Sequence, residues 1–414
     1  MKILWMCANF LHPTNKGGLI RSLGTLRHLA ARNEVHYIAY ENPEHPEAVE
    51  QAAEYSHRAY AIKHPIASRR SPRFAAQLAA GLLDPVPIAI RRFTSPALKR
   101  FAVELHARER FDRVVVDFVT MAGCAPDLGA SVLFQHNVET MIWRRRSERA
   151  RDPVSRAYLR LQADRMFRYE RDACLKARHV IAVSELDAAL MREMFGVERV
   201  SAVPTGVDVE YFERPAEPGS EPAADGQPAA DLVFVGSMDW LPNEEGVAWF
   251  IEEVLPLIRR KRPECRLAVV GRTPPPRILE YARRDPGVTV TGTVPDIRPY
   301  LWSGKVSIVP LRIAGGTRLK IYESMAAGTA VVSTAIGAEG LEIHPPEDIR
   351  IADGAPEFAA ECLDLLENAA ERERMAQQAR AMVEARFSWE TVARQFADIL
   401  ESSGAAPDSR PARS

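Results

Sequence analysis

Short apolar runs rich in β-branched residues alternate along the chain with longer segments of helical periodicity. The runs are KILWMC, EVHYIAY, RVVVDFV, SVLFQH, HVIAVS and RVSAVP in the first half, and DLVFVGS, CRLAVVG, GVTVTG, VSIVPL and TAVVST in the second. Apolar residues occupy consecutive positions in these runs, which is typical of strands covered on both faces. Strands that alternate with helices predict parallel βαβ units. The pattern therefore predicts an α/β protein with two doubly wound, Rossmann-like domains.

The composition changes once, between residues 213 and 231, where ERPAEPGSEPAADGQPAAD lacks any periodicity. We therefore predict an N-terminal domain over 1–208, a linker over 209–230 and a C-terminal domain over 231–385. An amphipathic helix over 386–401 should follow, and 402–414 should form a disordered tail. Because ligands of doubly wound sheets bind at the carboxyl ends of strands, the two domains are expected to face a shared donor cleft.

The charge and the cysteines exclude several classes of protein. The 414 residues carry a formal net charge of -1, so the whole molecule has no field that attracts nucleic acid. The five cysteines are scattered and show no zinc-ligand spacing. The apolar opening MKILWMCANF breaks into HPTNK without an A-x-A cleavage site, so we expect a buried first strand rather than a signal peptide. No run approaches the roughly 18 apolar residues of a spanning helix. We expect a cytoplasmic protein whose membrane contact is at most peripheral, at the inner face.

A strongly basic stretch runs from residue 141 to 179, MIWRRRSERARDPVSRAYLRLQADRMFRYERDACLKARH. Its arginines alternate with large apolar residues at helical spacing, which suits an anionic membrane surface or an anionic acceptor. The alternative is a solvated helical face whose arginines pair with neighbouring acids. The sequence leaves both interpretations open.

The segment VPLRIAGGTRLKIYESMAAGTAVVSTAIGAEG, residues 309–340, predicts a strand, a glycine turn, a helix and a second strand. Gly315 and Gly316 permit a tight turn, and Thr317 suits the N-cap of the helix. Unpaired amides and the macrodipole make such a helix start an anion site, which phosphate fills well. The sequence therefore predicts a phosphate-binding turn here.

Three charged residues belong to that predicted helix. Lys320 and Glu323 are three positions apart and share one face, so the lysine can meet a diphosphate while the glutamate accepts ribose hydroxyls. Arg318 is two positions from Lys320 and ranks below it, because it reaches the same face only by wrapping back. The alternative is a surface helix in which Lys320 and Glu323 merely pair with each other.

The same segment resembles the donor-binding signature of family 4 of the retaining glycosyltransferases, which have the GT-B fold. In that signature a Glu-x7-Glu pattern precedes a small-residue turn; here Glu323 matches the second glutamate and SMAAGTAVVST matches the turn. Gly315 stands where the family has its first glutamate, which leaves the contacts to the donor sugar open. Backbone amides of Gly315 and Gly316, or a water, are the expected replacements.

Further segments resemble the family in the expected order. FVGSMDWLPNEEGVAWF resembles the strand and loop that open its C-terminal domain, with Gly236 and Ser237 near the donor; Ser237 replaces the usual basic residue, and Arg318 and Lys320 supply the charge instead. VTVTGTVPDIRPYL, with Thr293 and Val294, resembles the loop that holds the base. FSWETVARQFADIL resembles the closing helix, which returns to the N-terminal domain.

Two segments of the first half also resemble the family. PTNKGGLIRS resembles its glycine-rich loop, in which Gly17 and Gly18 let backbone amides approach the donor phosphate or the acceptor; the alternative is a simple turn. FQHNVE places His136 at a strand end, where the family has a histidine near the donor sugar. A structural histidine is the alternative.

The resemblance implies that a hexosyl group moves from a nucleoside diphosphate sugar to an acceptor hydroxyl with retention at the anomeric carbon, in cell-surface polysaccharide or glycan synthesis. Lys320, Arg318 and the helix start would stabilise the departing diphosphate, and His136 would hydrogen-bond to the donor sugar. No Asp-x-Asp motif is present, so we predict a metal-independent enzyme without a cofactor. The expected partners are the donor and a glycan or lipid-linked acceptor.

Other functions fit the same architecture. A UDP-sugar 2-epimerase would need several acid/base carboxylates in the cleft, which the sequence does not reveal. A transferase that binds nucleotide-sugar without turnover is suggested by Gly315 and Ser237. A dinucleotide-dependent oxidoreductase is disfavoured because no strand is followed by G-x-G-x-x-G with an acid about 20 residues on.

Overall fold

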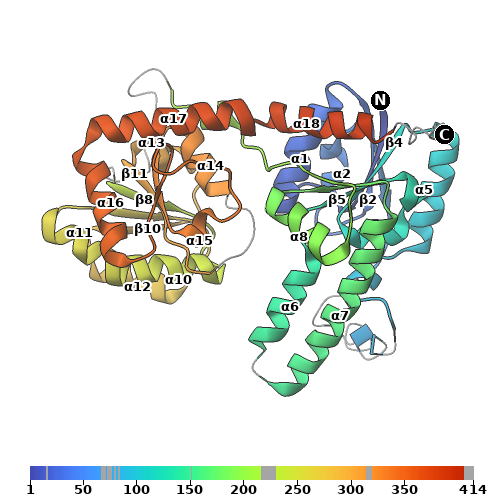
Figure 1. Ribbon diagram of the computed structural model, residues 1–414, viewed down its shortest axis with the longest axis horizontal. Coiled ribbons are helices and arrows are strands. Elements are labelled where there is room, and N and C mark those ends of the chain that lie inside the picture. Colours follow the sequence, from blue (N-terminus) through green and yellow to red (C-terminus); the bar gives the residue numbers. More distant parts are fainter. Residues whose placement is uncertain are drawn as a thin grey trace, which may run out of the picture. The chain divides into compact units, whose positions relative to one another are not determined.

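The chain forms two compact units in the computed structural model (Figure 1). The structure describes residues 1–14, 17–66, 71, 77–78, 81–82, 84–150, 152–215, 230–313 and 319–404. Unit 1 comprises Met1–Gly206 together with Trp389–Ser414, and unit 2 comprises Val207–Ser388. Each unit has a parallel sheet with apolar cores on both faces, so the predicted α/β fold class is confirmed.

The sheet of unit 1 has seven parallel strands in the order β3-β2-β1-β4-β5-β6-β7. This order reverses between β1 and β4, which creates a topological switch point at the carboxyl ends of those two strands. The strands are β1 (Lys2–Asn9), β2 (Glu34–Tyr40), β3 (Arg58–Ile62), β4 (Arg113–Asp117), β5 (Val132–Gln135), β6 (His179–Ala182) and β7 (Val200–Ala202).

Side chains on alternate strand positions pack into different cores. In β1, Leu4 and Met6 face the helices that follow β3 and β4, whereas Ile3 and Trp5 face the first and last helices of the chain. The helices of unit 1 are α1 (Gly17–Ala30), α2 (Ala48–Gln51), η1 (Ala52–Glu54), α4 (Ile88–Arg91), α5 (Pro96–Glu109), η2 (Val119–Cys124), η3 (Leu128–Ala130), α6 (Glu139–Arg149), α7 (Pro153–Lys176), α8 (Glu185–Phe195) and α18 (Trp389–Ser402).

Local signals in the sequence explain several helix starts. Ser95 caps α5 by accepting the amide of Leu98, and a proline occupies the first helical position. Asp152 caps α7 in the same way, again with a proline next to it. Ser184 caps α8 by accepting the amide of Asp187. These caps fix where the helices that follow β3, β5 and β6 begin.

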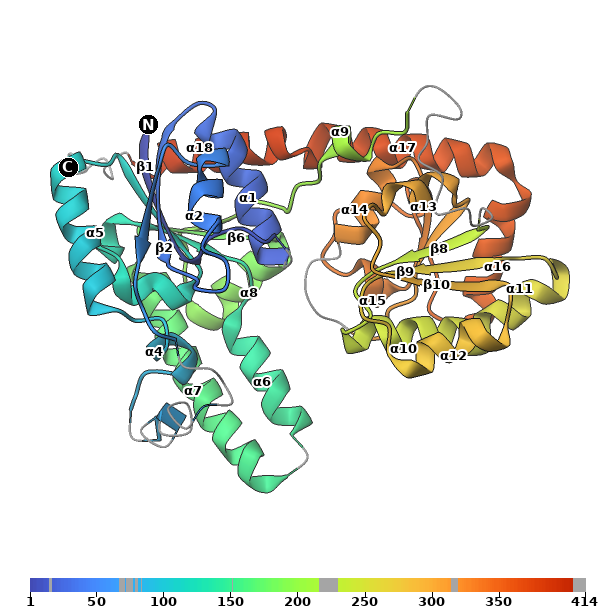
Figure 2. The ribbon, with the colours of Figure 1, turned by 180° about the vertical axis from the view of Figure 1, so that it is seen from behind.

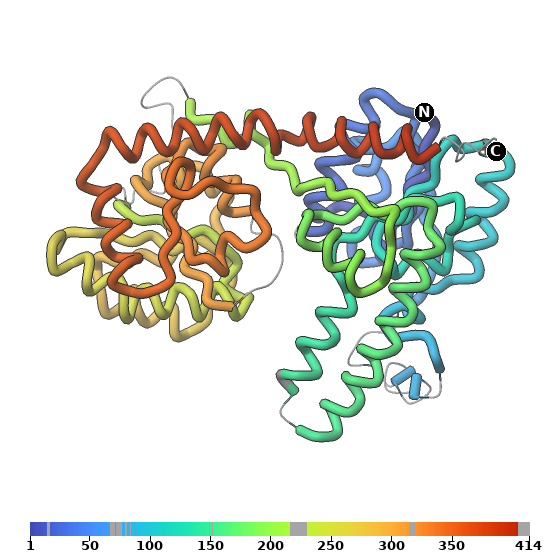
Figure 3. Tube along the Cα trace, viewed as in Figure 1, coloured from blue at the N-terminus to red at the C-terminus, as the bar shows by residue number. Residues whose placement is uncertain are grey.

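The last helix, α18, packs against the first, α1, within unit 1 (Figure 3). The indole of Trp389 lies against two glycines, because a Cβ added at Gly24 would lie 2.3 Å from the ring and one added at Gly206 would lie 2.4 Å from it. Val392, Phe396 and Leu400 continue the contact into the core around Trp5. The start of α18 is thus held by close packing of the Trp389 indole against the backbone of Gly24 and Gly206.

Helices α6 and α7 run antiparallel and project from the sheet of unit 1 (Figure 2). The carboxylate of the fully buried Glu170, on α7, accepts hydrogen bonds from the amides of Glu139 and Thr140 at the start of α6. It also accepts from the hydroxyl of Thr140 and the amide of Gln135 at the end of β5. Glu170 therefore joins α7, the start of α6 and the carboxyl end of β5.

The sheet of unit 2 has six parallel strands in the order β10-β9-β8-β11-β12-β13. Its order reverses between β8 and β11, so it has a switch point of the same kind as unit 1. The strands are β8 (Leu232–Val235), β9 (Leu267–Val270), β10 (Val288–Gly292), β11 (Val306–Val309), β12 (Ala330–Ser333) and β13 (Arg350–Ile351).

Two apolar cores enclose this sheet. One contains residues of α10, α11 and α16, and the other contains residues of α9, α13, α14 and the second half of α17. The helices of unit 2 are α9 (Val209–Phe212), α10 (Leu241–Trp249), the π-helical turn η4 (Phe250–Val254), α11 (Leu255–Lys261), α12 (Pro276–Arg284), α13 (Arg298–Ser303), α14 (Leu319–Ala326), α15 (Ala335–Ala338), α16 (Ala355–Glu367) and α17 (Ala369–Phe387).

The predicted linker over 209–230 begins with the short helix α9, and its residues 216–229 lie outside the described part of the chain. The same holds for residues 405–414 of the predicted tail. Among the helices that the structure describes, none is long and apolar enough to cross a membrane. All five cysteines are buried and unpaired.

Candidate functional site

Three of the predicted donor residues of unit 2, Gly236, Lys320 and Glu323, lie near the switch point of its sheet. Gly236 directly follows β8, and the chain that follows β11 leads into α14, which carries Lys320 and Glu323. Ligands of doubly wound sheets bind at this position. The predicted phosphate turn itself, with Gly315, Gly316, Thr317 and Arg318, lies outside the described residues.

The ammonium of Lys320 lies beside the backbone of Gly236 at the end of β8. Its Nζ donates a hydrogen bond of 2.8 Å to Oδ1 of Asn243 and lies 4.4 Å from the ring centroid of Phe234. A Cβ added at Gly236 would lie 2.6 Å from the same Nζ, so any larger residue there would displace the ammonium from its present position. Within the described residues, no carboxylate forms an ion pair with it. Lys320 is thus a partly buried cation that forms no ion pair with any residue that the structure describes.

The surroundings of Lys320 disfavour its charged form. Desolvation lowers its pKa to about 7, and the nearby charge of Glu323 only partly opposes this. Desolvation likewise raises the pKa of Glu323 to about 7. A bound anion at the ammonium would reverse the effect on Lys320, because a negative neighbour favours the charged form of a lysine.

Glu323 is one helical turn from Lys320 on α14 and is partly buried. No hydrogen bond joins its carboxylate to another described residue. Burial raises the pKa of Tyr211, and Glu323 is among the acidic neighbours that add to the rise. The carboxylate therefore lies near a tyrosine and keeps its acceptor sites available for a ligand hydroxyl.

Ser237 belongs to a small polar network at the same strand ends. Its hydroxyl donates to Asp239 over 2.6 Å and accepts from Nε of Arg272 over 2.7 Å, and its carbonyl accepts from Asn243. Arg272 was not among the predicted site residues, although a Gly-Arg pair directly after a buried strand was the available signal. Arg272 adds a second cation to this edge of the sheet, on an exposed side chain.

The predicted base loop follows β10. Thr293 is exposed and Val294 is partly buried against the aromatic core around Trp302. Beyond this loop the guanidinium of Arg298 lies 3.9 Å from the ring centroid of Tyr211 and also pairs with Asp296. The loop thus combines an exposed hydroxyl with apolar surface.

In unit 1 the predicted glycine loop leads into α1. Gly17 is the first residue of the helix and is exposed, with no atom within 4 Å of an added Cβ. Gly18 lies under an aromatic ring, because its added Cβ would lie 2.8 Å from Cζ of Phe118 and 3.6 Å from Nδ1 of His136. The structure therefore brings Gly18 and His136 together.

His136 sits in a buried network and is 2 % exposed. Its Nε2 contacts Oδ1 of Asp117 at 2.6 Å, and its Nδ1 contacts the guanidinium of Arg21 at 2.8 Å. Because a guanidinium only donates, Nδ1 must accept, and Nε2 then donates to Asp117. Burial lowers the pKa of His136, and Arg21 adds to this while Asp117 opposes it.

These two contacts limit the predicted role of His136. Both ring nitrogens are engaged with protein partners, so a direct hydrogen bond to a donor sugar requires one of them to be released. Asp117, at the end of β4, holds the network together by accepting from Trp5, Ser22 and His136. The signal for Asp117 was an acid directly after the apolar run of β4.

Phe118 covers His136. The two rings stack with centroids 3.9 Å apart and an interplanar angle of 10°. Phe118 also has φ 69 and ψ 143, a combination that costs a non-glycine residue free energy. The backbone is thus strained at the residue that shields the histidine, and the sequence contains no signal for it.

Among the side chains that the structure describes, no group of three or more His, Cys, Asp or Glu residues is placed to hold a metal ion. The predicted independence of metals stays a prediction, because a substrate phosphate can complete a metal site that the protein alone does not form.

Family models match both halves of the chain. Residues 17–211 match the model of Glycosyltransferase Family 4, and residues 229–368 match the model of Glycosyl transferases group 1. The chain belongs to glycosyltransferase family 4. The two matches cover the switch-point residues of both sheets, including Gly18, His136, Lys320 and Glu323.

Solved structures share the GT-B fold of this family member. Sucrose-phosphate synthase from Thermosynechococcus elongatus is 19% identical, with a TM-score of 0.68 over 97% of this chain and 98% of its own. HepE of Anabaena in complex with UDP is 16% identical, with a TM-score of 0.64 over 97% of this chain and 100% of its own. At these identities the likeness concerns the fold alone.

A relative with no assigned activity is similar in part. The uncharacterized 44.6 kDa protein in the cps region of Klebsiella pneumoniae is 24% identical over 146 residues. The match covers 33% of this chain and 37% of that protein, so the chain matches little more than a third of the length of this relative.

Proposed function

We propose that this family 4 member transfers a hexosyl group from a nucleoside diphosphate sugar to an acceptor hydroxyl with retention of anomeric configuration. The observation that carries the proposal is Lys320: a partly buried ammonium without an anionic partner among the described residues, set against the backbone of Gly236 at the switch point of unit 2. A site that keeps a cation in this way favours a bound anion. HepE, which shares the fold, was solved with UDP and with UDP-glucose.

The proposed donor contacts follow from unit 2. The ammonium of Lys320 would hold the diphosphate, and Glu323, one turn further along α14, would accept the ribose hydroxyls. The loop with Thr293 and Val294 would hold the base, since it offers a hydroxyl and apolar surface. Arg272 and Ser237 would border the phosphates.

The proposed mechanism needs no protein nucleophile. The bond that breaks joins the anomeric carbon to the diphosphate, so negative charge develops on the leaving phosphate. Lys320, together with Arg318 and the start of α14, would stabilise that charge by preorganised positive potential. We propose that the step is independent of metal ions, and that Gly17, Gly18 and His136 serve the donor sugar or the acceptor.

We also propose that the acceptor is a cell-surface glycan or its lipid-linked precursor, and that helices α6 and α7 bring unit 1 to the inner face of the membrane. Arg144, Arg145, Arg156 and Arg160 are exposed on this pair of helices, and Val154 is 81% exposed at its tip. Cations beside an exposed apolar side chain suit an anionic lipid surface. Sedimentation with vesicles tests this contact: binding should need phosphatidylglycerol and weaken in Arg156→Gln/Arg160→Gln.

The first experiment is thermal unfolding with UDP, GDP, ADP and their common sugar conjugates. A ligand at 100 times its Kd adds about 2.7 kcal/mol to the free energy of unfolding, so a selective rise in Tm identifies the nucleotide. The rise should be lost in Lys320→Met and reduced in Glu323→Ala. The matched control is Lys305→Met, which removes an exposed lysine of the same unit that pairs with Asp231 and should keep the rise.

The second experiment follows the product. Incubation with the selected nucleotide-sugar and candidate acceptors should give an α-linked product from an α-linked donor, by NMR of the anomeric proton, in the presence of EDTA. Conversion of the free donor to its C2 epimer would instead support an epimerase, and binding without any product would support a non-catalytic transferase. Undiminished turnover in both Lys320→Met and Glu323→Ala would refute the assigned site.

A further inference from the structure

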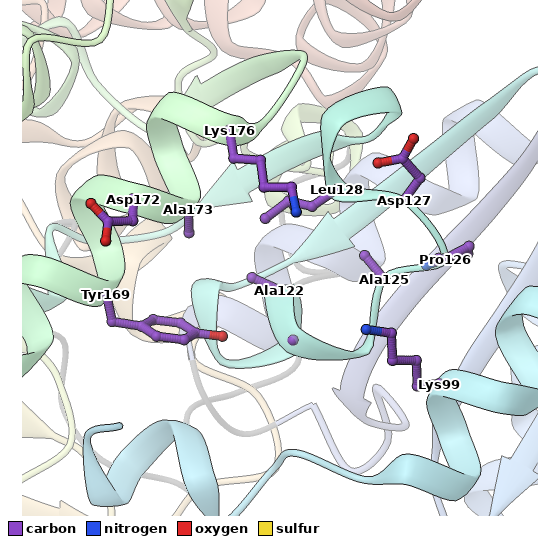
Figure 4. Close-up of a pocket in the computed structure, with 11 residues that line it drawn as sticks. Lys99, Ala122, Ala125, Pro126, Asp127, Leu128, Tyr169, Asp172, Ala173 and Lys176 are labelled. Atoms are coloured by element: carbon purple, nitrogen blue, oxygen red, sulfur yellow. The ribbon is translucent and has the colours of Figure 1, made fainter. Parts of the chain in front are cut away.

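Unit 1 contains a pocket of about 330 Å³ between α5, α7 and the segment that joins β4 to β5 (Figure 4). Lys99 belongs to the first turn of α5, and Tyr169 and Lys176 belong to the last two turns of α7. The volume is at the lower end of the range for small-molecule sites. The pocket is large enough for a ligand of the size of a sugar phosphate.

The polar groups that face this pocket are mainly hydrogen-bond donors. Figure 4 shows the ammonium groups of Lys99 and Lys176 and the hydroxyl of Tyr169 turned toward its interior. Burial raises the pKa of Tyr169 to about 12, so its hydroxyl keeps its proton and can donate. Neither lysine forms an ion pair with a described residue.

The two carboxylates at the rim have partners elsewhere. Asp127 accepts the amide of Gly129 in the turn of η3, and Asp172 accepts two hydrogen bonds from Arg171. In Figure 4 both carboxylates point away from the interior. Asp127 and Asp172 also line the pocket, but among the described residues neither forms an ion pair with Lys99 or Lys176. The floor between the lysines is apolar, formed by small side chains such as Ala122 and Ala173.

This pocket is remote from the switch point of its sheet. Leu128 and Lys176 shortly precede β5 and β6, so they lie toward the amino ends of these strands, whereas His136 lies at a carboxyl end. The pocket therefore lies apart from the residues assigned to the donor or the acceptor. Next to Tyr169 on α7, Glu170 accepts hydrogen bonds from the start of α6.

We propose that this pocket is a second ligand site of unit 1, which binds a small phosphate ester of the size of a hexose phosphate. Two ammonium groups and a phenol hydroxyl supply three donors to the phosphate oxygens, and the apolar floor accommodates the carbon skeleton. The site is independent of the proposed transfer reaction, since no residue of the donor site contributes to it.

Titration calorimetry with inorganic phosphate and with glucose 1-phosphate tests the site. The Lys320→Met variant is the background, because it removes the ammonium that would bind phosphate in unit 2. Saturable binding should persist in Lys320→Met, with glucose 1-phosphate binding more tightly than phosphate. Adding Lys99→Met and Lys176→Met should weaken binding by at least about tenfold. Tyr169→Phe should weaken it less.

The matched control adds Arg32→Met and Lys63→Met to the same background, which removes two exposed cations of unit 1 outside the pocket and outside α6 and α7. Binding should be unchanged in this control. Equal loss in the control would show that net charge alone attracts phosphate and would overturn the proposal, as would the absence of saturable binding in Lys320→Met. Unfolding curves of the free variants confirm that each is folded.

A phospholipid headgroup offers the same phosphate chemistry as a soluble phosphate ester. A vesicle-binding experiment distinguishes these two ligands. Vesicles of phosphatidylcholine with phosphatidic acid should bind the pocket variant and the control equally if the pocket takes a soluble ester. The proposal of a soluble ligand would be overturned by two results together: vesicle binding is lost only in Lys99→Met/Lys176→Met, and Lys320→Met does not bind glucose 1-phosphate. The pocket would then be assigned to a lipid headgroup.

Discussion

In the proposed donor site, Lys320 would couple ligand binding to proton uptake. Its ammonium is surrounded by Asn243, Phe234 and the backbone at Gly236, and desolvation lowers its pKa to about 7. Near neutral pH the free protein therefore holds this lysine partly neutral. A diphosphate binds the charged form, so binding should draw a proton from solvent.

The first prediction is that nucleoside diphosphate affinity falls as pH rises from 7 to 9. Above pH 7 the free protein loses the proton that the complex keeps, so Kd should increase by up to about tenfold per pH unit. The diphosphate has nearly completed its own ionisation by pH 7, since the last phosphate pKa is about 6. Lys320→Arg keeps its charge throughout and should show a flatter profile. An equally steep profile in Lys320→Arg would assign the titration to another group, such as Glu323.

The second prediction concerns the ring that covers His136. Phe118→Ala should admit water to the network, and since burial is the main cause of the lowered pKa, the pKa of His136 should rise toward 6.5. NMR titration of the imidazole Cε1 proton measures this, and carbethoxylation of His136 should become faster. Phe93→Ala is a control that removes a phenylalanine from unit 1 away from the network. An unchanged pKa would mean that Arg21 and the surrounding backbone, rather than Phe118, exclude water.

At the scale of elements, α18 is docked to unit 1 by an indole that needs two glycines. Alanine normally improves the interior of a helix, by roughly 1 kcal/mol over glycine. Gly24 lies in α1, but its Cβ would overlap the ring of Trp389. For Gly24→Ala, helix propensity therefore favours the folded state, whereas packing against Trp389 disfavours it.

The third prediction is that Gly24→Ala lowers the free energy of unfolding by about 2 kcal/mol, because packing outweighs propensity. Urea unfolding measures the change. Gly17→Ala, in the same helix with open space at its Cβ, serves as the control and should be neutral or stabilising. Stabilisation by Gly24→Ala would show that α18 shifts easily, and the Gly24→Ala/Trp389→Leu double variant should recover part of the loss.

The fourth prediction concerns Glu170, which joins α7 to the start of α6. Burial raises its pKa from 4.5 to about 7, against the opposing hydrogen bonds from Thr140 and Glu139. The folded protein then binds more protons than the unfolded chain between pH 4.5 and 7. Below pH 4.5 the wild type therefore has the full stabilisation that protonated Glu170 provides. As pH rises from 4.5 to 7, the free energy of unfolding of the wild type falls relative to that of Glu170→Gln, by up to about 3 kcal/mol.

Urea unfolding of both proteins at pH 4.5 and pH 8 checks this sign. Glu148→Gln, on an exposed side chain of α6, is the control and should track the wild type at both values. If the wild type instead gains stability over Glu170→Gln as pH rises, the hydrogen bonds to this carboxylate outweigh burial, and it is charged in the folded protein.

At the scale of the whole molecule, the chain consists of two units whose sheets share one strand order over six strands, with a seventh strand, β7, added in unit 1. Each sheet has a switch point at the carboxyl ends of its strands. The cation and carboxylate assigned to the donor lie together in unit 2. The buried network of Asp117, His136 and Arg21 lies in unit 1. The two units therefore offer chemically different surfaces on one repeated architecture.

The fifth prediction follows from this division. Hydrogen exchange with and without the nucleoside diphosphate should show the largest protection in two peptides of unit 2, over 236–243 and 319–326, because these contain the assigned contacts. The α6 and α7 peptides of unit 1 should change less. If protection were centred on unit 1 instead, the nucleotide would bind there, and the assignment of Lys320 would be contradicted.

The sequence by itself determined the fold class and most of the strands. Consecutive apolar residues identified most of the buried strands, since period and length are local properties of the chain. The caps that Ser95, Asp152 and Ser184 form in the structure are local in the same sense, because each side chain accepts a hydrogen bond from an amide three residues further on. Lys320 and Glu323 could be paired because a three-residue spacing fixes a shared helical face.

Only the tertiary structure decided which distant residues meet. Nothing local links Lys320 to Asn243, Trp389 to Gly24, or His136 to Asp117 and Arg21. The burial that shifts the pKa values of Lys320, Glu323 and Glu170 likewise comes from packing between elements. The strain at Phe118 and the pocket beside Lys99 also arise only when the strands and helices assemble, because each depends on several segments at once.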